Sequence, residues 1–325
     1  MPLILDEPSV ASLLTMDDLI PLMRKTLAEF SSGRARQPVR AAVPLEAGAA
    51  LYVMPGYLPE SRAAAIKAVS LAPGNSERGL PTHFATLLLF DPETGALLAM
   101  MDGRLVTEMR TAAVSAAAAD ALASREARTL AILGTGVQAR SHLEALRLVR
   151  PIERVRVWSP TLEHREAFAR EMSKTGTLDV VAASSAEEAV RGAEVIVTAT
   201  LSAEPVLRGA WLAPGACVVA VGASRSDARE VDGETVRRAR CFVDSRAAAD
   251  VEAGDLLLAI QEGAITVDHV AGEIGEVFAG SIPGRTSGAG ITFFKSLGQA
   301  VEDAAAAKLV YDRARVAGTG VEIDV

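Results

Sequence analysis

The stretch Thr129-Leu130-Ala131-Ile132-Leu133-Gly134-Thr135-Gly136-Val137-Gln138-Ala139 decides the fold that we expect. An apolar run ends at two glycines, and a helical pattern of apolar residues begins at once. This order of strand, tight turn and helix opens a dinucleotide-binding fold. Gly134 allows the sharp turn, Gly136 lets a pyrophosphate approach the backbone, and the helix N-terminus offers unpaired N–H groups. The alternative, an ordinary strand-to-helix turn, is disfavoured because further β/α units follow.

The residues after this turn continue in a β/α alternation. Apolar runs that predict strands alternate with amphipathic runs that predict helices. The expected strands are 154–158, 179–182, 195–199, 217–222 and 241–244, and the expected helices are 163–174 and 186–191. This order predicts an α/β fold, with a Rossmann-type, doubly wound parallel sheet.

The N-terminal third has a different pattern, in which strands follow one another without intervening helices. A short strand over 3–5 and a helix from about residue 15 come first, and an Ala-rich helix over 107–123 bridges to the glycine turn. The expected strands are 39–44, 50–54, 66–71, 84–90 and 96–101, the last two flanking a hairpin loop at 91–95. Such a succession predicts a mostly antiparallel sheet in a separate α+β domain.

Composition excludes several classes of function. The 325 residues are enough for two domains, and the net charge of −8 without a basic tract argues against a nucleic-acid partner. Cys217 and Cys241 form neither a disulfide framework nor a metal-ligand spacing, so we expect no metal and a reducing compartment. Because the N-terminus lacks a signal-peptide pattern and no apolar segment reaches membrane length, we expect a soluble cytoplasmic protein.

Three cationic side chains are candidates for binding an anionic substrate. We expect Arg110 in the first turn of the bridging helix, where guanidinium and helix N-terminus together suit a carboxylate. A solvated surface Arg is the alternative, favoured on that residue alone. Lys67 shares a strand face with Val69 and Leu71. It either protects an edge strand from aggregation or, if buried, requires an anionic partner or a lowered pKa. Arg40 is similar, whereas the lone His83 favours a packing or hydrogen-bonding role.

In dinucleotide-binding folds, a residue at the end of the second strand contacts the 2′-hydroxyl or 2′-phosphate of the cofactor ribose. An NAD enzyme usually has Asp or Glu there, but this chain has Trp158-Ser159-Pro160-Thr161. Ser159 and Thr161 could donate hydrogen bonds to a 2′-phosphate, with Arg165 or His164 as a nearby cation. This favours NADP(H), with NAD(H) as the alternative.

Several motifs together make the chain resemble the ornithine cyclodeaminase/mu-crystallin family over nearly its whole length. The most specific are the Arg110-Thr111-Ala112-Ala113 block and the glycine turn. The others are Lys67-Ala68-Val69-Ser70, Met101-Asp102-Gly103, Val221-Gly222-Ala223-Ser224, Glu273-Ile274-Gly275-Glu276-Val277 and Thr292-Phe293-Phe294-Lys295-Ser296-Leu297-Gly298. The family contains cyclodeaminases, alanine dehydrogenases and reductases of imino acids, all of which use a nicotinamide cofactor.

The resemblance implies two domains with different roles. Residues 1–118 and 305–325 would form a substrate-binding and dimerisation domain, residues 119–304 the dinucleotide-binding domain, and the protein a homodimer. The implied catalytic residues are Lys67 and Arg110, which with Arg40, His83 and Ser224 would bind the substrate. The implied cofactor-binding residues are Thr111, Gly134, Gly136, Val137, Gln138, Ser159, Thr161, Arg165, Thr200, Val221, Gly222 and Thr292, with Thr292 near the nicotinamide.

One departure from the family pattern selects the subgroup. Cyclodeaminases and archaeal-type alanine dehydrogenases carry Gly-x-Asp-x-Pro-Gly-Lys after the strand, but this chain has Ser224 at the Asp position and no Pro-Gly-Lys. Asp227 lies three residues on, where we expect it to cap a turn. The pattern looks like the ketimine-reductase branch, so we expect NAD(P)H-dependent reduction of an α-imino acid to an L-amino acid. The alternatives are a cyclodeaminase or alanine dehydrogenase, and a non-catalytic ligand-binding protein.

Overall fold

The computed structural model describes residues 1–175 and 178–324 and divides into two compact units. The first unit comprises residues 1–110 and 298–325, and the second comprises 111–297. The expected boundaries at 118/119 and 304/305 lie inside helices α3 (Arg104–Leu122) and α11 (Ala300–Ala317). The observed boundaries therefore assign the first residues of α11 to the first unit, together with Lys67 and Arg110.

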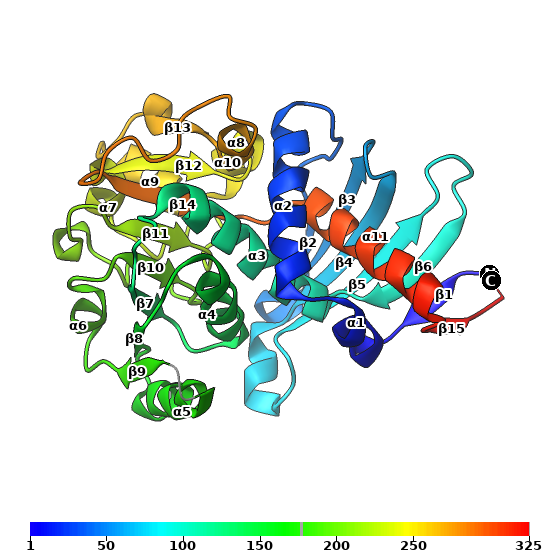
Figure 1. The fold of residues 1–325 in the computed structure, drawn as a ribbon, viewed down its shortest axis with the longest axis horizontal. Helices are drawn as coiled ribbons and strands as arrows, with labels where there is room; N and C mark the ends of the chain where they lie inside the picture. Colours follow the sequence, from blue (N-terminus) through cyan, green and yellow to red (C-terminus); the bar gives the residue numbers. More distant parts are fainter. Residues whose placement is uncertain (176–177, 325) are drawn as a thin grey trace. The chain divides into compact units, whose positions relative to one another are not determined.

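The first unit is built on a seven-stranded sheet with the order β15-β1-β6-β5-β4-β3-β2 (Figure 1). Every neighbouring pair is antiparallel except β1 and β6. This confirms the mostly antiparallel α+β expectation. The elements are β1 (Leu3–Leu5), α1 (Glu7–Leu13), α2 (Met16–Ser31), β2 (Ala41–Pro44), β3 (Ala50–Leu58), β4 (Ala63–Leu71), β5 (His83–Phe90), β6 (Leu97–Asp102), the start of α3, α11 and β15 (Val321–Glu322).

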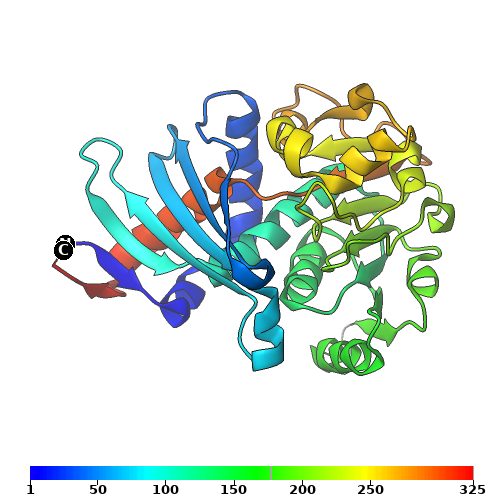
Figure 2. The same cartoon turned by 180° about the vertical axis from the view of Figure 1, so that it is seen from behind.

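One face of this sheet is covered by α11, which packs on β3 and β4 and is itself contacted by α2. Figure 2 looks onto the opposite face, with α11 behind the strands. Strand β4 alternates buried and half-buried residues along its length, and Lys67 shares the buried face with Ala65 and Val69. The strand lies between β3 and β5, so Lys67 is not an edge-strand guard.

The second unit is an eight-stranded sheet with the order β13-β12-β14-β11-β10-β7-β8-β9, in which all neighbours are parallel. This confirms the doubly wound Rossmann-type expectation. The strands are β7 (Thr129–Leu133), β8 (Arg154–Trp158), β9 (Asp179–Ala182), β10 (Val195–Thr198), β11 (Cys217–Ala220), β12 (Ala239–Val243), β13 (Val270–Glu273) and β14 (Ile291–Lys295). The helices are α4 (Val137–Val149), α5 (Leu162–Met172), α6 (Ala186–Val190), α7 (Gly233–Arg238), α8 (Arg246–Glu252), α9 (Gly254–Gln261) and α10 (Ile274–Phe278).

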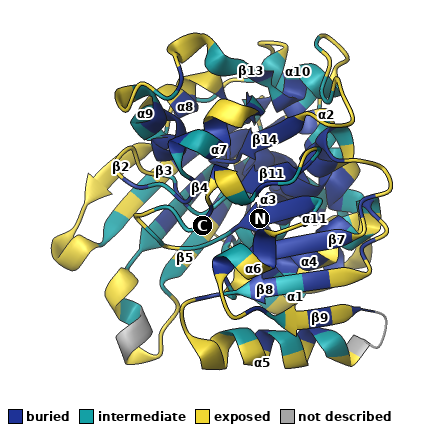
Figure 3. Cartoon of the chain, turned by 90° about the vertical axis from the view of Figure 1, so that its left-hand side faces the viewer, coloured by how far each residue is buried: buried dark blue, intermediate teal, exposed yellow. Residues whose placement is uncertain are grey.

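The strand order places a switch point beside β7. The chain continues from β7 to β8 and β9 on one side, then returns to β10 and β11 on the other. Strands β7, β10 and β11 are buried throughout, as the dark blue ribbons of Figure 3 show for β7 and β11. In open α/β sheets, ligands bind outside the carboxyl ends of the strands at such a point.

None of the helices within the described part of the chain combines the length and the hydropathy that crossing a bilayer requires.

Candidate active site

A buried cluster of charged side chains lies on the covered face of the first unit. Lys67 on β4 and Arg110 on α3 both contact Asp303 in the first turn of α11. The Lys67 Nζ–Asp303 Oδ2 distance is 2.5 Å, and Arg110 Nε donates to Asp303 Oδ1 at 3.0 Å. Arg110 Nη1 also donates to Glu302 Oε2 at 2.5 Å. All four side chains are at most 5 % exposed, so these ion pairs lie in largely buried surroundings.

Burial and neighbouring charges set the protonation of this cluster. Burial, together with the cations of Arg110 and Arg40, lowers the pKa of Lys67 to about 8, although Asp303 opposes the shift. Burial favours the neutral form of Asp303, but Arg110 and Lys67 outweigh it and lower the pKa of that carboxyl. Near neutral pH Lys67 is therefore mainly an ammonium and Asp303 a carboxylate.

Arg40 adds a third cation to the cluster. The half-buried Arg40 donates from Nη2 to the carbonyl of Gly298 at 3.4 Å. Gly298 has a φ of +81°, and a Cβ there would lie 2.6 Å from Arg110 Nη1. A glycine is thus required both by the backbone conformation and by the guanidinium beside it.

His83 is the first residue of β5 and pairs with Leu71 of β4. Burial, followed by the charges of Lys67 and Arg110, lowers the pKa of His83 to about 4. The imidazole is therefore neutral at physiological pH and can accept or donate one hydrogen bond without adding charge.

The helix around Arg110 differs from our expectation. Helix α3 begins at Arg104, so Arg110 lies in its second turn rather than its first. The proposed pairing of guanidinium and helix N-terminus is therefore wrong, and so is the surface-Arg alternative, because Arg110 is 4 % exposed. What fixes Arg110 is instead the pair of carboxylates on α11.

The glycine turn of the second unit has the geometry that a phosphate site needs. Gly134 has a φ of +119°, and its N–H donates to the carbonyl of Trp158 at 2.8 Å. Gly136 is the N-cap of α4, and a Cβ there would meet only open space. Gly136 and Val137 are exposed, so the first N–H groups of α4 are accessible to an anion. These residues fit a nucleotide pyrophosphate.

The turn after β8 carries the residues expected at the cofactor 2′ position. The Ser159 hydroxyl donates to the carbonyl of Thr161 at 3.1 Å, and Arg165 Nη1 donates to the carbonyl of Ser159 at 3.0 Å. The hydroxyl hydrogen of Ser159 is thus used within the turn, whereas Thr161 is exposed.

The structure divides the remaining predicted site residues between the two edges of the second sheet. Thr200, Val221, Gly222 and Ser224 follow β10 and β11 at the carboxyl edge, which is also the edge of the glycine turn. Thr292 instead pairs with Cys217 at the amino end of β11, and its buried hydroxyl donates to the carbonyl of Leu122 at 3.0 Å. We therefore correct the expectation that Thr292 lies near the nicotinamide.

The structure also shows the surroundings of Thr111 and Asp227. Thr111 is buried on α3, one residue after Arg110. The exposed Asp227 pairs with Arg225, whose Nε lies 2.9 Å from Asp227 Oδ1, instead of capping a turn as expected. Within residues 1–175 and 178–324, no group of three or more His, Cys, Asp or Glu side chains is placed to hold a metal ion.

Sequence reasoning missed Glu302 and Asp303. Acidic residues are common in the first turn of a helix. Glu302 and Asp303, at the start of this Ala-rich helix, therefore do not stand out as partners for buried cations. The usable signal was that both acids fall within a run of alanines that predicts burial on every face.

A dinucleotide-binding unit and an α+β unit with a buried cation cluster define a two-domain, nucleotide-dependent enzyme class. The model of the ornithine cyclodeaminase/mu-crystallin family matches residues 2–318, and the chain belongs to that family. It is 47% identical to the ketimine reductase mu-crystallin of Mus musculus, over 90% of this chain and 91% of that protein.

Solved structures agree with this assignment. The Δ1-pyrroline-2-carboxylate reductase of Thermococcus litoralis, in complex with NADH and L-proline, superposes with a TM-score of 0.96 at 38% identity, covering 99% of this chain and 100% of the other. An archaeal alanine dehydrogenase dimer with bound NAD superposes with a TM-score of 0.94 at 34% identity, covering 99% of both chains.

Proposed function

We propose that this chain is an NAD(P)H-dependent oxidoreductase that reduces the C=N bond of an α-imino acid to give an L-amino acid. The observation that carries the proposal is the buried cluster of Lys67, Arg110 and Arg40, in a chain that also has the glycine turn. The relatives that it matches include a ketimine reductase and a pyrroline-2-carboxylate reductase.

The cations of the cluster would bind a substrate carboxylate. Lys67 and Arg110 contact the carboxylate of Asp303, and Arg110 also contacts that of Glu302. An ammonium and a guanidinium already fixed by buried carboxylates lose little freedom on binding, so they would hold the substrate in one orientation.

A bound nicotinamide would supply the hydride that reduces the imine carbon. The chain's own contribution is to bind and orient. We assign the pyrophosphate to Gly134, Gly136, Val137 and Gln138 at the start of α4, and the rest of the cofactor to the loops carrying Thr200, Val221 and Gly222. On the substrate side, Lys67 and Arg110 would clamp the carboxylate, with Arg40 and His83 of the same unit around it. The substrate contact expected of Ser224 stays a prediction.

NADP(H) is the cofactor form that we propose. The tip of β8 lacks a carboxylate that would repel a 2′-phosphate, and the exposed Thr161 hydroxyl lies beside the Arg165 contact to this turn. We also propose a cytoplasmic location, since Cys217 and Cys241 are buried free thiols.

The direct test is oxidation of NADPH and NADH with pyrroline-2-carboxylate, piperideine-2-carboxylate and iminosuccinate, together with ammonia release from ornithine. Turnover of at least one imine, with a lower KM for NADPH than for NADH, is expected. Ammonia release from ornithine without net NADH would instead indicate a cyclodeaminase, which Ser224 in place of a carboxylate disfavours. Tight cofactor binding without turnover of any imine would indicate a non-catalytic binding protein.

The pH dependence of substrate binding is expected to follow Lys67. Burial lowers the pKa of Lys67 to about 8, so the ammonium is present below that pH and is lost above it. A carboxylate inhibitor that does not itself titrate between pH 6 and 10, such as cyclopentanecarboxylate, should show a constant Ki at low pH. Above pH ~8 its Ki should rise by up to about tenfold per pH unit. The rise should disappear in Lys67→Met, and a flat wild-type profile would exclude Lys67 from the carboxylate site.

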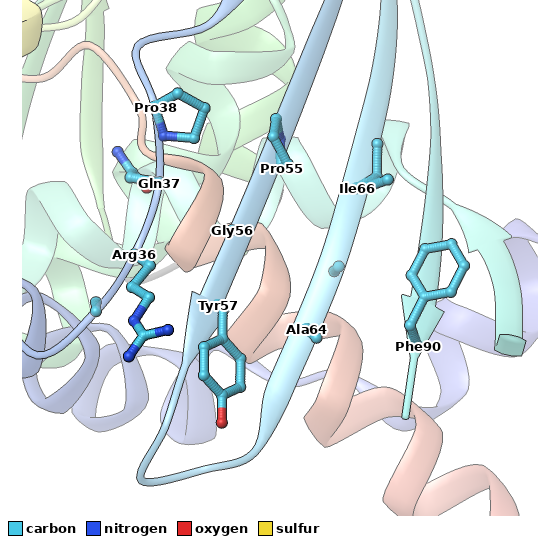
Figure 4. Close-up of a pocket in the computed structure, with 11 residues that line it drawn as sticks. Arg36, Gln37, Pro38, Pro55, Gly56, Tyr57, Ala64, Ile66 and Phe90 are labelled. Atoms are coloured by element: carbon cyan, nitrogen blue, oxygen red, sulfur yellow. The ribbon is translucent and has the colours of Figure 1, made fainter. Parts of the chain in front are cut away.

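A homodimer formed through the uncovered face of the first sheet is the assembly that we propose. Residues of β3, β4 and β5 and the segment 35–38 line a hollow of about 570 Å³, and Figure 4 shows Tyr57, Ile66 and Phe90 along it, with Arg36 and Gln37 at one side. Val53, Phe84 and Met100 extend the apolar face and are 37 %, 46 % and 37 % exposed. An apolar face of this extent is typical of a protein interface.

Phe90→Asp is expected to convert the dimer to a monomer, because a buried unpaired carboxylate is unfavourable at an interface. Sedimentation velocity measures the change, and Val316→Asp on the 91 % exposed end of α11 is the matched control that should stay dimeric. A wild-type monomer, or a Phe90→Asp dimer, would contradict the proposed interface.

A further inference from the structure

Glu230 is a buried carboxylate for which neither the sequence motifs nor the proposed chemistry provides a role. It lies in the segment between β11 and α7 and is 0% exposed. Burial raises the pKa of this carboxyl, and Asp255 adds to the shift, whereas Lys295 and the bonds from Thr200 and Thr198 act in the opposite direction. A group placed in such surroundings requires strong hydrogen-bonding partners.

The partners of Glu230 come from the end of β10 and from the loops that follow β10 and β11. Oε1 accepts from the Thr200 backbone N–H at 2.6 Å and from the Thr200 hydroxyl at 2.8 Å. Oε2 accepts from the Gly222 N–H at 2.6 Å and from the Thr198 hydroxyl at 2.8 Å. Every partner is a donor, so the carboxylate form satisfies all four groups at once.

The backbone around Gly222 is tightly packed against Thr200 and Glu230. A Cβ at Gly222 would lie 2.1 Å from the carbonyl oxygen of Thr200 and 2.5 Å from Glu230 Oε1. The loops after β10 and β11 therefore approach each other closely at this point, with the carboxylate beside the contact. The Thr200 carbonyl alone excludes any side chain larger than hydrogen at residue 222.

Glu230 is itself held by a second buried layer. Its N–H and that of Val231 donate to Asp255 Oδ1 at 2.7 and 3.0 Å. Asp255 Oδ2 lies 2.9 Å from Lys295 Nζ at the end of β14, and both of these side chains are fully buried. The carboxylate is thus anchored to α9 and to a central strand, and its position is fixed independently of any ligand.

We propose that Glu230 is a positioning residue for cofactor binding, because it fixes the Thr200 and Gly222 loops in one relative arrangement. This inference rests on the proposed nucleotide-dependent function, since those loops lie at the sheet edge that carries the glycine turn. Beyond that function, Glu230 would preorganise the part of the cofactor site formed by the Thr200 and Gly222 loops. Glu230 does not touch the cofactor, so its effect is transmitted entirely through the two loops.

Glu230→Gln tests this directly. The amide replaces one acceptor oxygen with an NH2 donor, which then faces either the Thr200 or the Gly222 donors. Losing such a bond to a buried charged group is expected to raise the Kd and KM for NAD(P)H by about 10- to 100-fold. The KM for the imino acid should stay within about twofold, because the Lys67 cluster belongs to the other unit.

Glu194→Gln is the matched control. Glu194 immediately precedes β10 at the amino edge of the same sheet, and Oε2 accepts from the backbone N–H groups of Arg128 and Thr129 at 2.8 and 3.0 Å. In Glu194→Gln the amide oxygen can still accept from both N–H groups, so the substitution removes only the negative charge of a carboxylate bridge at the edge opposite the glycine turn. It is expected to lower the melting temperature without changing the Kd for NAD(P)H.

The outcomes separate the two proposals. If the wild-type protein binds neither NADH nor NADPH, the proposed function fails. If the wild type binds them and Glu230→Gln binds equally well, or if Glu194→Gln weakens binding as much, then Glu230 acts on stability alone and the positioning role is excluded.

Discussion

Lys67→Met is expected to reduce kcat/KM for the imino acid by about a thousandfold or more while leaving the Kd for NAD(P)H unchanged. The substitution removes the ammonium that would pair with the substrate carboxylate, and it leaves Asp303 with Arg110 as its charged partner. Truncating one partner of a buried, hydrogen-bonded charge pair at a binding site costs about 2–5 kcal/mol, and a thousandfold loss of kcat/KM corresponds to about 4 kcal/mol. Steady-state kinetics and a fluorescence titration with NADPH measure the two effects.

Lys308→Met provides the control in the same unit. Lys308 lies on α11 and forms an (i, i+4) pair with Asp312, in which the two side chains are 26% and 55% exposed. An exposed pair of this kind contributes ~0.2–1 kcal/mol, so kcat/KM should remain within about twofold of the wild type. Retention of kcat/KM to within about tenfold in Lys67→Met would remove Lys67 from the proposed substrate site.

Gly134→Ala is expected to abolish measurable cofactor binding and to lower the melting temperature of the protein. The φ of Gly134 is +119°, and a Cβ there would overlap the carbonyl oxygen of Ala199. Strain and overlap together should destabilise the second unit by ~3 kcal/mol or more, equivalent to a decrease of about 6–12 °C. The displaced turn would also misplace the N-terminus of α4. Calorimetry of the apoprotein and titration with NADPH measure both effects.

The comparison variant is Gly192→Ala. Gly192 also has a positive φ, +73°, but a Cβ there meets nothing within 4 Å. It therefore isolates the backbone strain, about 1–2 kcal/mol, from the steric overlap. Its cofactor affinity should equal that of the wild type. Equal losses of affinity in the two variants would mean that general destabilisation, not the glycine turn, limits cofactor binding.

The sequence predicted the elements whose patterns are local. The period of apolar residues predicted most strands of both sheets to within a few residues, and the glycine turn identified β7 and α4. The two-residue strand β15 was not predicted. Strands β13 and β14 were also not predicted, although most of β14 lies within the motif that begins at Thr292. Short buried parallel strands lack the alternation that marks a half-exposed strand, which explains the omission.

The site was predicted less completely, because its charges compensate one another across large distances in the sequence. Lys67 and Arg110 could be singled out as cations in apolar surroundings, but their partners, Glu302 and Asp303, are nearly 200 residues or more away. Thr292 was assigned to the wrong edge of the sheet, because a motif does not specify strand register. Glu230 was missed since its role depends on two loops meeting in space.

The return of α11 to the first sheet has a consequence for biosynthesis. Lys67 and Arg110 are translated early, whereas the carboxylates that neutralise them lie at the start of the last long helix. Until the ribosome has made that helix, the nascent N-terminal segment holds two uncompensated cations at positions destined for its core. Translation products that end before α11 therefore lack both the helix that covers this sheet and the carboxylates that pair with these cations.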